Sequence, residues 1–124
     1  MSIQFQIEEM SGYLAVRFTG RGTVEDVPQP FESIAEYCKR ANKNRLLLDF
    51  AGAYGYGKLY LADRYFFGEQ TQIFARYELL KVAVVARPER VDPEKFADVV
   101  AQNRGMNLRT FTNVEDAREW LLKE

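Results

Sequence analysis

Two short apolar runs constrain the fold more than any other feature of this chain. Residues 46–50 (LLLDF) and 81–86 (KVAVVA) are apolar almost throughout, without the alternation of a half-exposed strand. Runs of this kind are typical of central strands that are covered on both faces. A helical pattern separates them, which indicates a right-handed crossover and parallel pairing. The runs therefore predict an α/β protein.

The remaining elements follow from periodicity and capping signals. Residues 3–8 and 14–19 alternate apolar with polar side chains around a Ser11-Gly12 turn, which predicts an antiparallel hairpin with one buried face on each strand. We expect helices over about 30–42, 58–76 and 92–105 and from Asn113 onward, and a last strand over 108–112. The order is β-β-α-β-α-β-α-β-α, a mixed sheet of about five strands flanked by helices in a single domain, residues 1–124.

Composition and charge exclude several classes of function. The formal net charge is -1 and the pI is about 5.6, which disfavours a nucleic-acid binder that relies on bulk positive charge. No segment approaches the roughly 20 apolar residues of a membrane span. Residues 1–10 lack the basic start and apolar run of a signal peptide. We therefore expect a cytoplasmic protein without a membrane span.

Catalytic and metal chemistry are limited because the chain has no histidine and one cysteine, Cys38. Ser-His-Asp and Cys-His catalysis and the usual His-containing zinc sites are unavailable. Cys38 shares the helical spacing of Phe31, Ile34 and Ala35, which predicts a small core residue rather than a reactive thiol. We expect no catalytic residue, no metal and no cofactor, and a protein that is not an enzyme.

Residues 52–58 (GAYGYGK) match the G-x-x-x-x-G-K pattern of a phosphate-binding loop. In such loops the residue after the lysine is a Ser or Thr that binds magnesium, whereas here it is Leu59. Tyr54 and Tyr56 also place bulky rings in the segment. We therefore interpret it as a glycine-rich connection between a strand and a helix.

A candidate binding surface lies at this junction, because ligands often bind where a strand ends beside a helix. Its residues are Asp49, Tyr54, Tyr56, Lys58 and Tyr60. Tyrosines in a loop at a strand end suit contact with a partner or an apolar ligand. Asp49 could bind a cation or act as a base, but more often such a residue accepts hydrogen bonds from nearby N–H groups. Elsewhere, Arg104 and Arg109 suggest either an anion site or ordinary surface residues.

Several motifs in order resemble the SpoIIAA-like branch of the STAS superfamily. They are residues 46–49 (LLLD), 63–65 (DRY), 68–69 (GE), 81–85 (KVAVV), Phe96, 103–105 (NRG), Phe111 and 117–121 (AREWL). The resemblance covers nearly the whole chain and implies a bacterial STAS-like fold. In anti-anti-sigma members it implies binding of a kinase-type anti-sigma factor, switched by a phosphorylated serine after the central strand. Here no Ser or Thr lies between Asp49 and Thr71, so that switch does not carry over.

Two functional hypotheses remain. The first is a non-catalytic regulatory or interaction module whose surface centres on residues 52–58. The second is a carrier of a small apolar, lipid-like ligand, because the branch also resembles lipid-carrying CRAL-TRIO domains in fold. Its pocket would lie between the helix over 59–74 and the sheet. Pairing with a second copy, a homodimer, is a further option.

Overall fold

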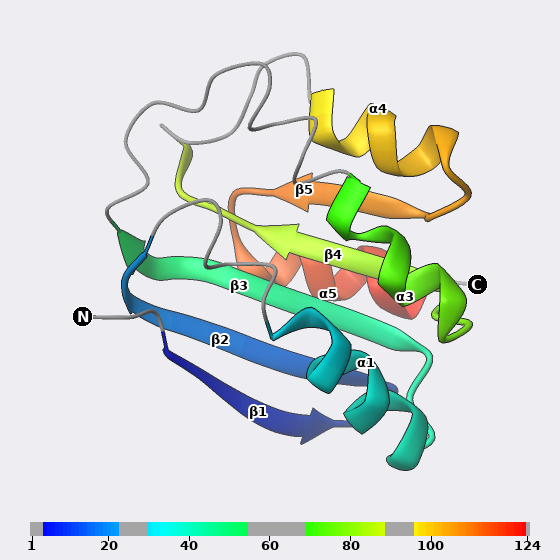
Figure 1. Ribbon diagram of the computed structural model, residues 1–124. Coiled ribbons are helices and arrows are strands. Elements are labelled where there is room, and N and C mark those ends of the chain that lie inside the picture. The colour runs from blue at the N-terminus through cyan, green and yellow to red at the C-terminus, as the bar shows by residue number, and fades with distance from the viewer. Residues whose placement is uncertain (1–3, 23–29, 55–68, 89–95, 124) are drawn as a thin grey trace.

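The computed structural model describes residues 4–22, 30–54, 69–88 and 96–123. Within them, one five-stranded sheet has the order β1-β2-β3-β4-β5 (Figure 1). The strands are β1 (Gln4–Met10), β2 (Tyr13–Arg21), β3 (Arg45–Tyr54), β4 (Lys81–Val85) and β5 (Leu108–Phe111). β1 and β2 pair antiparallel, and each later pair is parallel. The predicted mixed α/β sheet with an N-terminal hairpin is confirmed.

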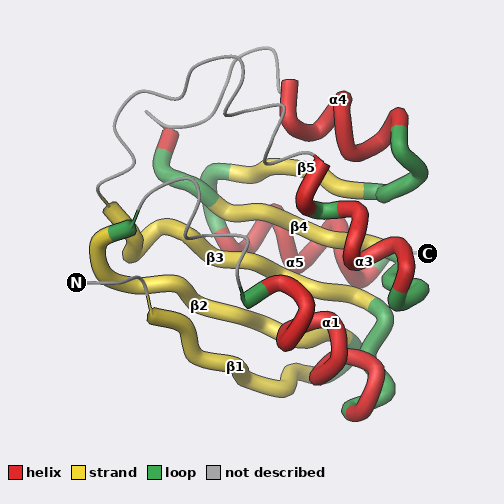
Figure 2. Tube along the Cα trace, in the orientation of Figure 1, coloured by secondary structure: helices red, strands yellow, loops and turns green. Residues whose placement is uncertain are grey.

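Helices cover both faces of the sheet. They are α1 (Phe31–Arg40), α3 (Gln72–Arg76), α4 (Phe96–Asn103) and α5 (Val114–Leu122). α1, α3 and α4 lie on one face, and α5 lies alone on the other (Figures 1 and 2). This arrangement explains the two continuous apolar runs, because β3 and β4 contribute side chains to a core on each side.

The larger core lies between the sheet and the face of α1 and α3. Phe31, Ile34, Ala35 and Cys38 of α1 are buried in it, as their spacing predicts. Phe74 of α3 is fully buried, and its ring centre lies 5.0 Å from that of Phe31. An aromatic contact therefore joins α3 to α1.

The smaller core lies beneath α5. Ala117 and Leu121 pack there on Leu47, Ala83 and Val85, and Trp120 lies at its margin. Asn113 begins the helix, because its side chain accepts a hydrogen bond from the backbone N–H of Asp116 at 2.8 Å. Both the cap and the inward face of this helix agree with the sequence prediction.

Several boundaries differ from the prediction. The first helix ends at Arg40 rather than Asn42, because Asn42 adopts a left-handed conformation (φ 59°) that asparagine tolerates better than most residues. β3 continues to Tyr54, well beyond the predicted end at Phe50. The predicted buried face of the first strand is only partial, since Phe5 is 37% exposed at the edge of the sheet. The predicted starts of the helices over 58–76 and 92–105 lie outside the described residues.

Candidate functional site at the carboxyl end of β3

The carboxyl half of β3 contains a β-bulge. Arg17 of β2 pairs with Asp49, whereas Thr19 pairs with Gly52, so Phe18 alone lies opposite both Phe50 and Ala51. A bulge of this kind bends its strand and re-aims the residues after it. Here those residues are the ones that lead into the Gly-Tyr segment.

Side chains complete the hydrogen bonds of the extra residue, Ala51. Asp49 Oδ1 accepts the Ala51 N–H at 2.9 Å, and Arg87 Nε donates to the Ala51 carbonyl oxygen at 2.8 Å. Asp49 therefore lies within the strand rather than at its end, and its carboxylate hydrogen-bonds a nearby backbone N–H. Arg87, an exposed residue shortly after β4, bonds to the other side of the same residue.

Close packing beneath the bulge leaves little room for movement. The rings of Phe18 and Phe50 stack with centres 4.4 Å apart. A Cβ atom at Gly52 would lie 3.2 Å from the Phe18 carbonyl oxygen and 3.3 Å from Thr19 Cγ2. Gly52 therefore lets β3 approach β2 more closely than a larger residue would allow, and its place in β3 corrects the interpretation of Gly52 as a loop residue.

The predicted tyrosines are only partly placed. Tyr54 is the last residue of β3 and pairs with Arg21, so it does not belong to a loop as predicted. Tyr56, Lys58 and Tyr60 lie outside the described residues. Their membership of one surface with Asp49 and Tyr54 stays a prediction.

A polar surface adjoins this site on the face of the sheet that carries α5. α5 packs over β3, β4 and β5, and the strand pairings place exposed or half-exposed polar side chains of the first strands beside it. We call these residues the polar sheet face: Gln4, Gln6, Glu8, Arg17, Thr19 and Asp49. Sequence reasoning missed it, although the polar positions of the hairpin alternation were its signal.

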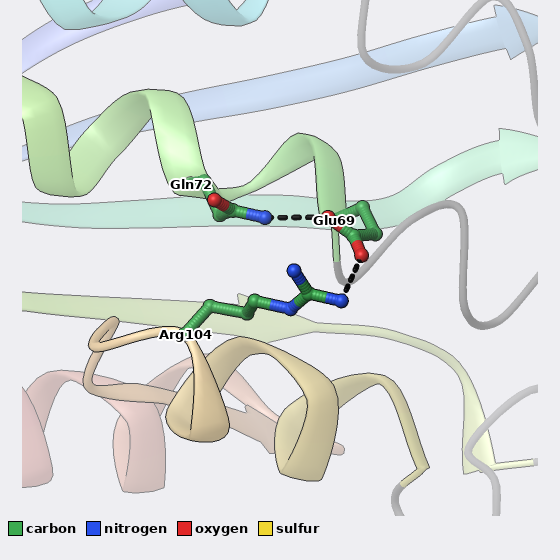
Figure 3. A network of polar contacts seen from close by, with 3 residues as sticks. All are labelled: Glu69, Gln72 and Arg104. Atoms are coloured by element: carbon green, nitrogen blue, oxygen red, sulfur yellow. Dashed lines mark hydrogen bonds and ion pairs between the residues drawn. The ribbon is translucent and has the colours of Figure 1, made fainter.

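Arg104 and Arg109 do not form one anion site. Arg104 forms an ion pair with Glu69, and Glu69 also accepts a hydrogen bond from Gln72 Nε2 at 2.5 Å (Figure 3). Arg109 instead lies over the Trp120 ring, with its guanidinium carbon 5.7 Å from the ring centre. The Glu69–Arg104 pair joins the segment before α3 to the turn after α4, and so links two short motifs that are distant in sequence.

A half-open pocket of about 310 Å³ lies beside β5 and not where an apolar pocket was expected. Its lining residues are Asp98, Val99, Gln102, Arg109 and Phe111. Both carboxylate oxygens of Asp98 accept hydrogen bonds from Thr110, at 2.6 and 2.9 Å. In the described part of the helix expected over 59–74, Phe74 is fully buried within the larger core, which also contains side chains of the sheet.

The described residues offer no catalytic thiol or metal cluster. Burial raises the pKa of Cys38 to about 12, so its thiol stays protonated at neutral pH. No group of three or more His, Cys, Asp or Glu side chains in this part of the chain is placed to hold a metal ion. Over the same residues, no helix is long and apolar enough to cross a membrane.

Comparisons with known proteins agree with this architecture. An uncharacterised protein of the DUF3478 family from Shewanella loihica PV-4, described as having a SpoIIAA-like fold, has a TM-score of 0.54 at 22% identity, over 97% of this chain and 94% of that one. An anti-sigma factor antagonist from Mycobacterium paratuberculosis has a TM-score of 0.59 at 16% identity, over 98% and 96%. A search of curated proteins finds no match. The SpoIIAA-like family model matches residues 13–122, and the chain therefore belongs to the SpoIIAA-like family.

Proposed function

We propose that this chain is a non-catalytic interaction module that binds a protein partner at the carboxyl end of β3. The observation that carries the proposal is the bulge at Ala51, whose backbone groups are both bonded by side chains, Asp49 and Arg87. Bulges recur beside functional sites because they redirect the chain. Here the exit of β3 is fixed in direction, and the Gly-Tyr segment comes directly after it.

The related anti-sigma factor antagonist supports a protein as the partner, and an anti-sigma factor is the class that we propose. Docking would not be switched by serine or threonine phosphorylation next to the strand, because residues 50–70 contain no Ser or Thr. Tyr54, Tyr56 and Tyr60 would supply the aromatic contacts that protein interfaces favour, and Lys58 would add a charge at the polar rim. Binding by this surface would then depend on the unmodified side chains rather than on a phosphorylated serine or threonine.

Site-specific photo-crosslinking in cells tests the proposal because it captures a partner whose identity is unknown. A photoreactive phenylalanine analogue replaces Tyr56 in one variant and the exposed Arg118 of α5 in a matched control. We expect one discrete covalent adduct from the Tyr56 variant and none from the control. Adducts of equal yield from both positions, or none from Tyr56, would contradict the proposal.

The alternative of an apolar-ligand carrier has less support in the described residues. Phe74 is fully buried where α3 meets the sheet, and the pocket beside β5 is lined by Asp98, Gln102 and Arg109 along with its apolar residues. Lipid-sized pockets are mostly apolar, with few polar groups. Native mass spectrometry of the purified protein tests this alternative, which predicts a bound lipid of defined mass.

A further inference from the structure

The outward backbone groups at the two edges of the sheet differ in their hydrogen-bond partners. At the β5 edge, the backbone N–H of Thr110 donates to Asp98 Oδ2 at 2.9 Å, and Gln102 Nε2 donates to the Leu108 carbonyl oxygen at 3.0 Å. Both side chains come from α4, so the Thr110 N–H and the Leu108 carbonyl oxygen at the outer edge of β5 have side-chain partners. These contacts hinder the addition of another strand at this edge.

The β1 edge is open by comparison. Met10 and Tyr13 flank a two-residue turn and form the last pair of the hairpin, so hydrogen-bonded pairs recur at every second residue from Met10. Phe5, Ile7 and Glu9 therefore direct their backbone N–H and C=O groups away from β2. Among the described residues, no other segment bonds to these groups.

β1 has few of the features that protect an edge strand, apart from the two acids Glu8 and Glu9 at one end. It is seven residues long, it contains no proline or lysine, and its register with β2 is uninterrupted. Phe5 is 37% exposed on this strand, on the same face as Phe18 and Val16 of the core. A neighbouring strand at this edge would extend that apolar face.

We propose that β1 pairs antiparallel with β1 of a second copy of this chain, about a two-fold axis at Gln6. In this register Phe5 lies opposite Ile7 on both sides of the axis, and their outward N–H and C=O groups form the hydrogen bonds. On the polar face, Gln6 lies opposite Gln6 and Gln4 lies opposite Glu8. No acid faces an acid, and the two sheets become one continuous sheet.

The acids at one end of β1 disfavour axes at Ile7 and Glu8, and an axis at Phe5 would pair only residues 4–6 of the strand. An axis at Ile7 would place Phe5 opposite Glu9, and an axis at Glu8 would place two Glu8 carboxylates together. Like charges directly opposite each other destabilise a strand pair. The charge pattern and the length of the paired segment together favour the Gln6 register, in which a second copy supplies the complementary strand.

Disulfide trapping tests the register. In the proposed pair the two Gln6 residues form a non-hydrogen-bonded pair about 4.5 Å apart at Cα, within disulfide range. Two Glu8 residues would lie four residues out of register, about 13 Å apart. We expect mild oxidation to crosslink the Gln6→Cys variant and leave the Glu8→Cys control monomeric. Cys38 does not interfere, because it is fully buried.

Sedimentation velocity over a range of concentrations tests the dimer itself. The Gln4→Glu/Gln6→Glu variant places acids opposite acids across the axis, and should weaken dimerisation at least about five-fold. A Gln70→Glu/Asn44→Asp control makes the same change in net charge at exposed positions away from β1, and should dimerise like the wild type. A wild-type chain that stays monomeric throughout, or equal crosslinking of both cysteine variants, would overturn the proposal.

Discussion

Burial controls the chemistry of Cys38. Its side chain is fully buried in the α1 core, and desolvation of the thiolate raises its pKa to about 12. We expect a thiol reagent at pH 8 to label the native protein far more slowly than the protein in urea. Rapid, complete labelling with an unchanged circular dichroism spectrum would show that the thiol is accessible.

The same pKa shift makes stability depend on alkaline pH. The unfolded thiol ionises near 9.0, whereas the folded thiol remains protonated up to about 12. Between these values the unfolded state has released a proton that the folded state retains, so stability falls as pH rises. The Cys38→Ala variant lacks this group. Between pH 9 and pH 12 the urea midpoint of the wild type should therefore fall relative to that of the variant.

Glu78 adopts a backbone conformation that suits glycine better. Its φ is +64° and its side chain is exposed, so a Cβ atom strains the backbone without packing against the core. We expect Glu78→Gly to raise the free energy of unfolding by up to about 1 kcal/mol, after the entropy cost of glycine.

Glu119→Gly is the matched control for this change, because Glu119 is exposed within α5. There the substitution should lower stability by about 1 kcal/mol, since glycine is a poor helix former. Both values come from urea titrations monitored by circular dichroism. A loss of stability in both variants would contradict the strain at Glu78.

At the scale of the element, one carboxylate oxygen of Asp49 bonds the Ala51 N–H at the bulge in β3. Asp49→Ala removes the acceptor for the Ala51 N–H and should cost about 1 kcal/mol of stability. Asp49→Asn keeps an oxygen in the same place and should recover most of the loss. Equal destabilisation by both substitutions, measured in urea, would indicate that the negative charge matters rather than the hydrogen bond.

Elements whose signals are local could be predicted from the sequence. The apolar runs of β3 and β4, the buried face of α1 and the Asn113 cap each depend on residues a few positions apart. The bulge could not be predicted, because it is defined by how β3 pairs with β2. For the same reason Asp49 was placed at a strand end, and Gly52 in a loop.

At the scale of the whole molecule, contacts between distant segments escaped prediction. The Glu69–Arg104 ion pair joins two motifs that the sequence shows only separately, and the exposure of Phe5 depends on β1 lying at the edge. The polar sheet face likewise exists because α5 packs over β3, β4 and β5. Sequence patterns predict which side of a strand is apolar, but not how far the helices cover it.

The sharpest test of partner binding at the carboxyl end of β3 is an affinity measurement. The partner identified by photo-crosslinking is titrated with the wild-type chain and with variants of the proposed surface. Calorimetry would compare the wild type with Tyr54→Ala/Tyr56→Ala and with Arg118→Ala on α5. We predict that the tyrosine variant binds at least about ten-fold more weakly, with a change in stability below about 1 kcal/mol, while the control binds normally. Unchanged affinity of the tyrosine variant, or an equal loss in the control, would contradict binding at this surface.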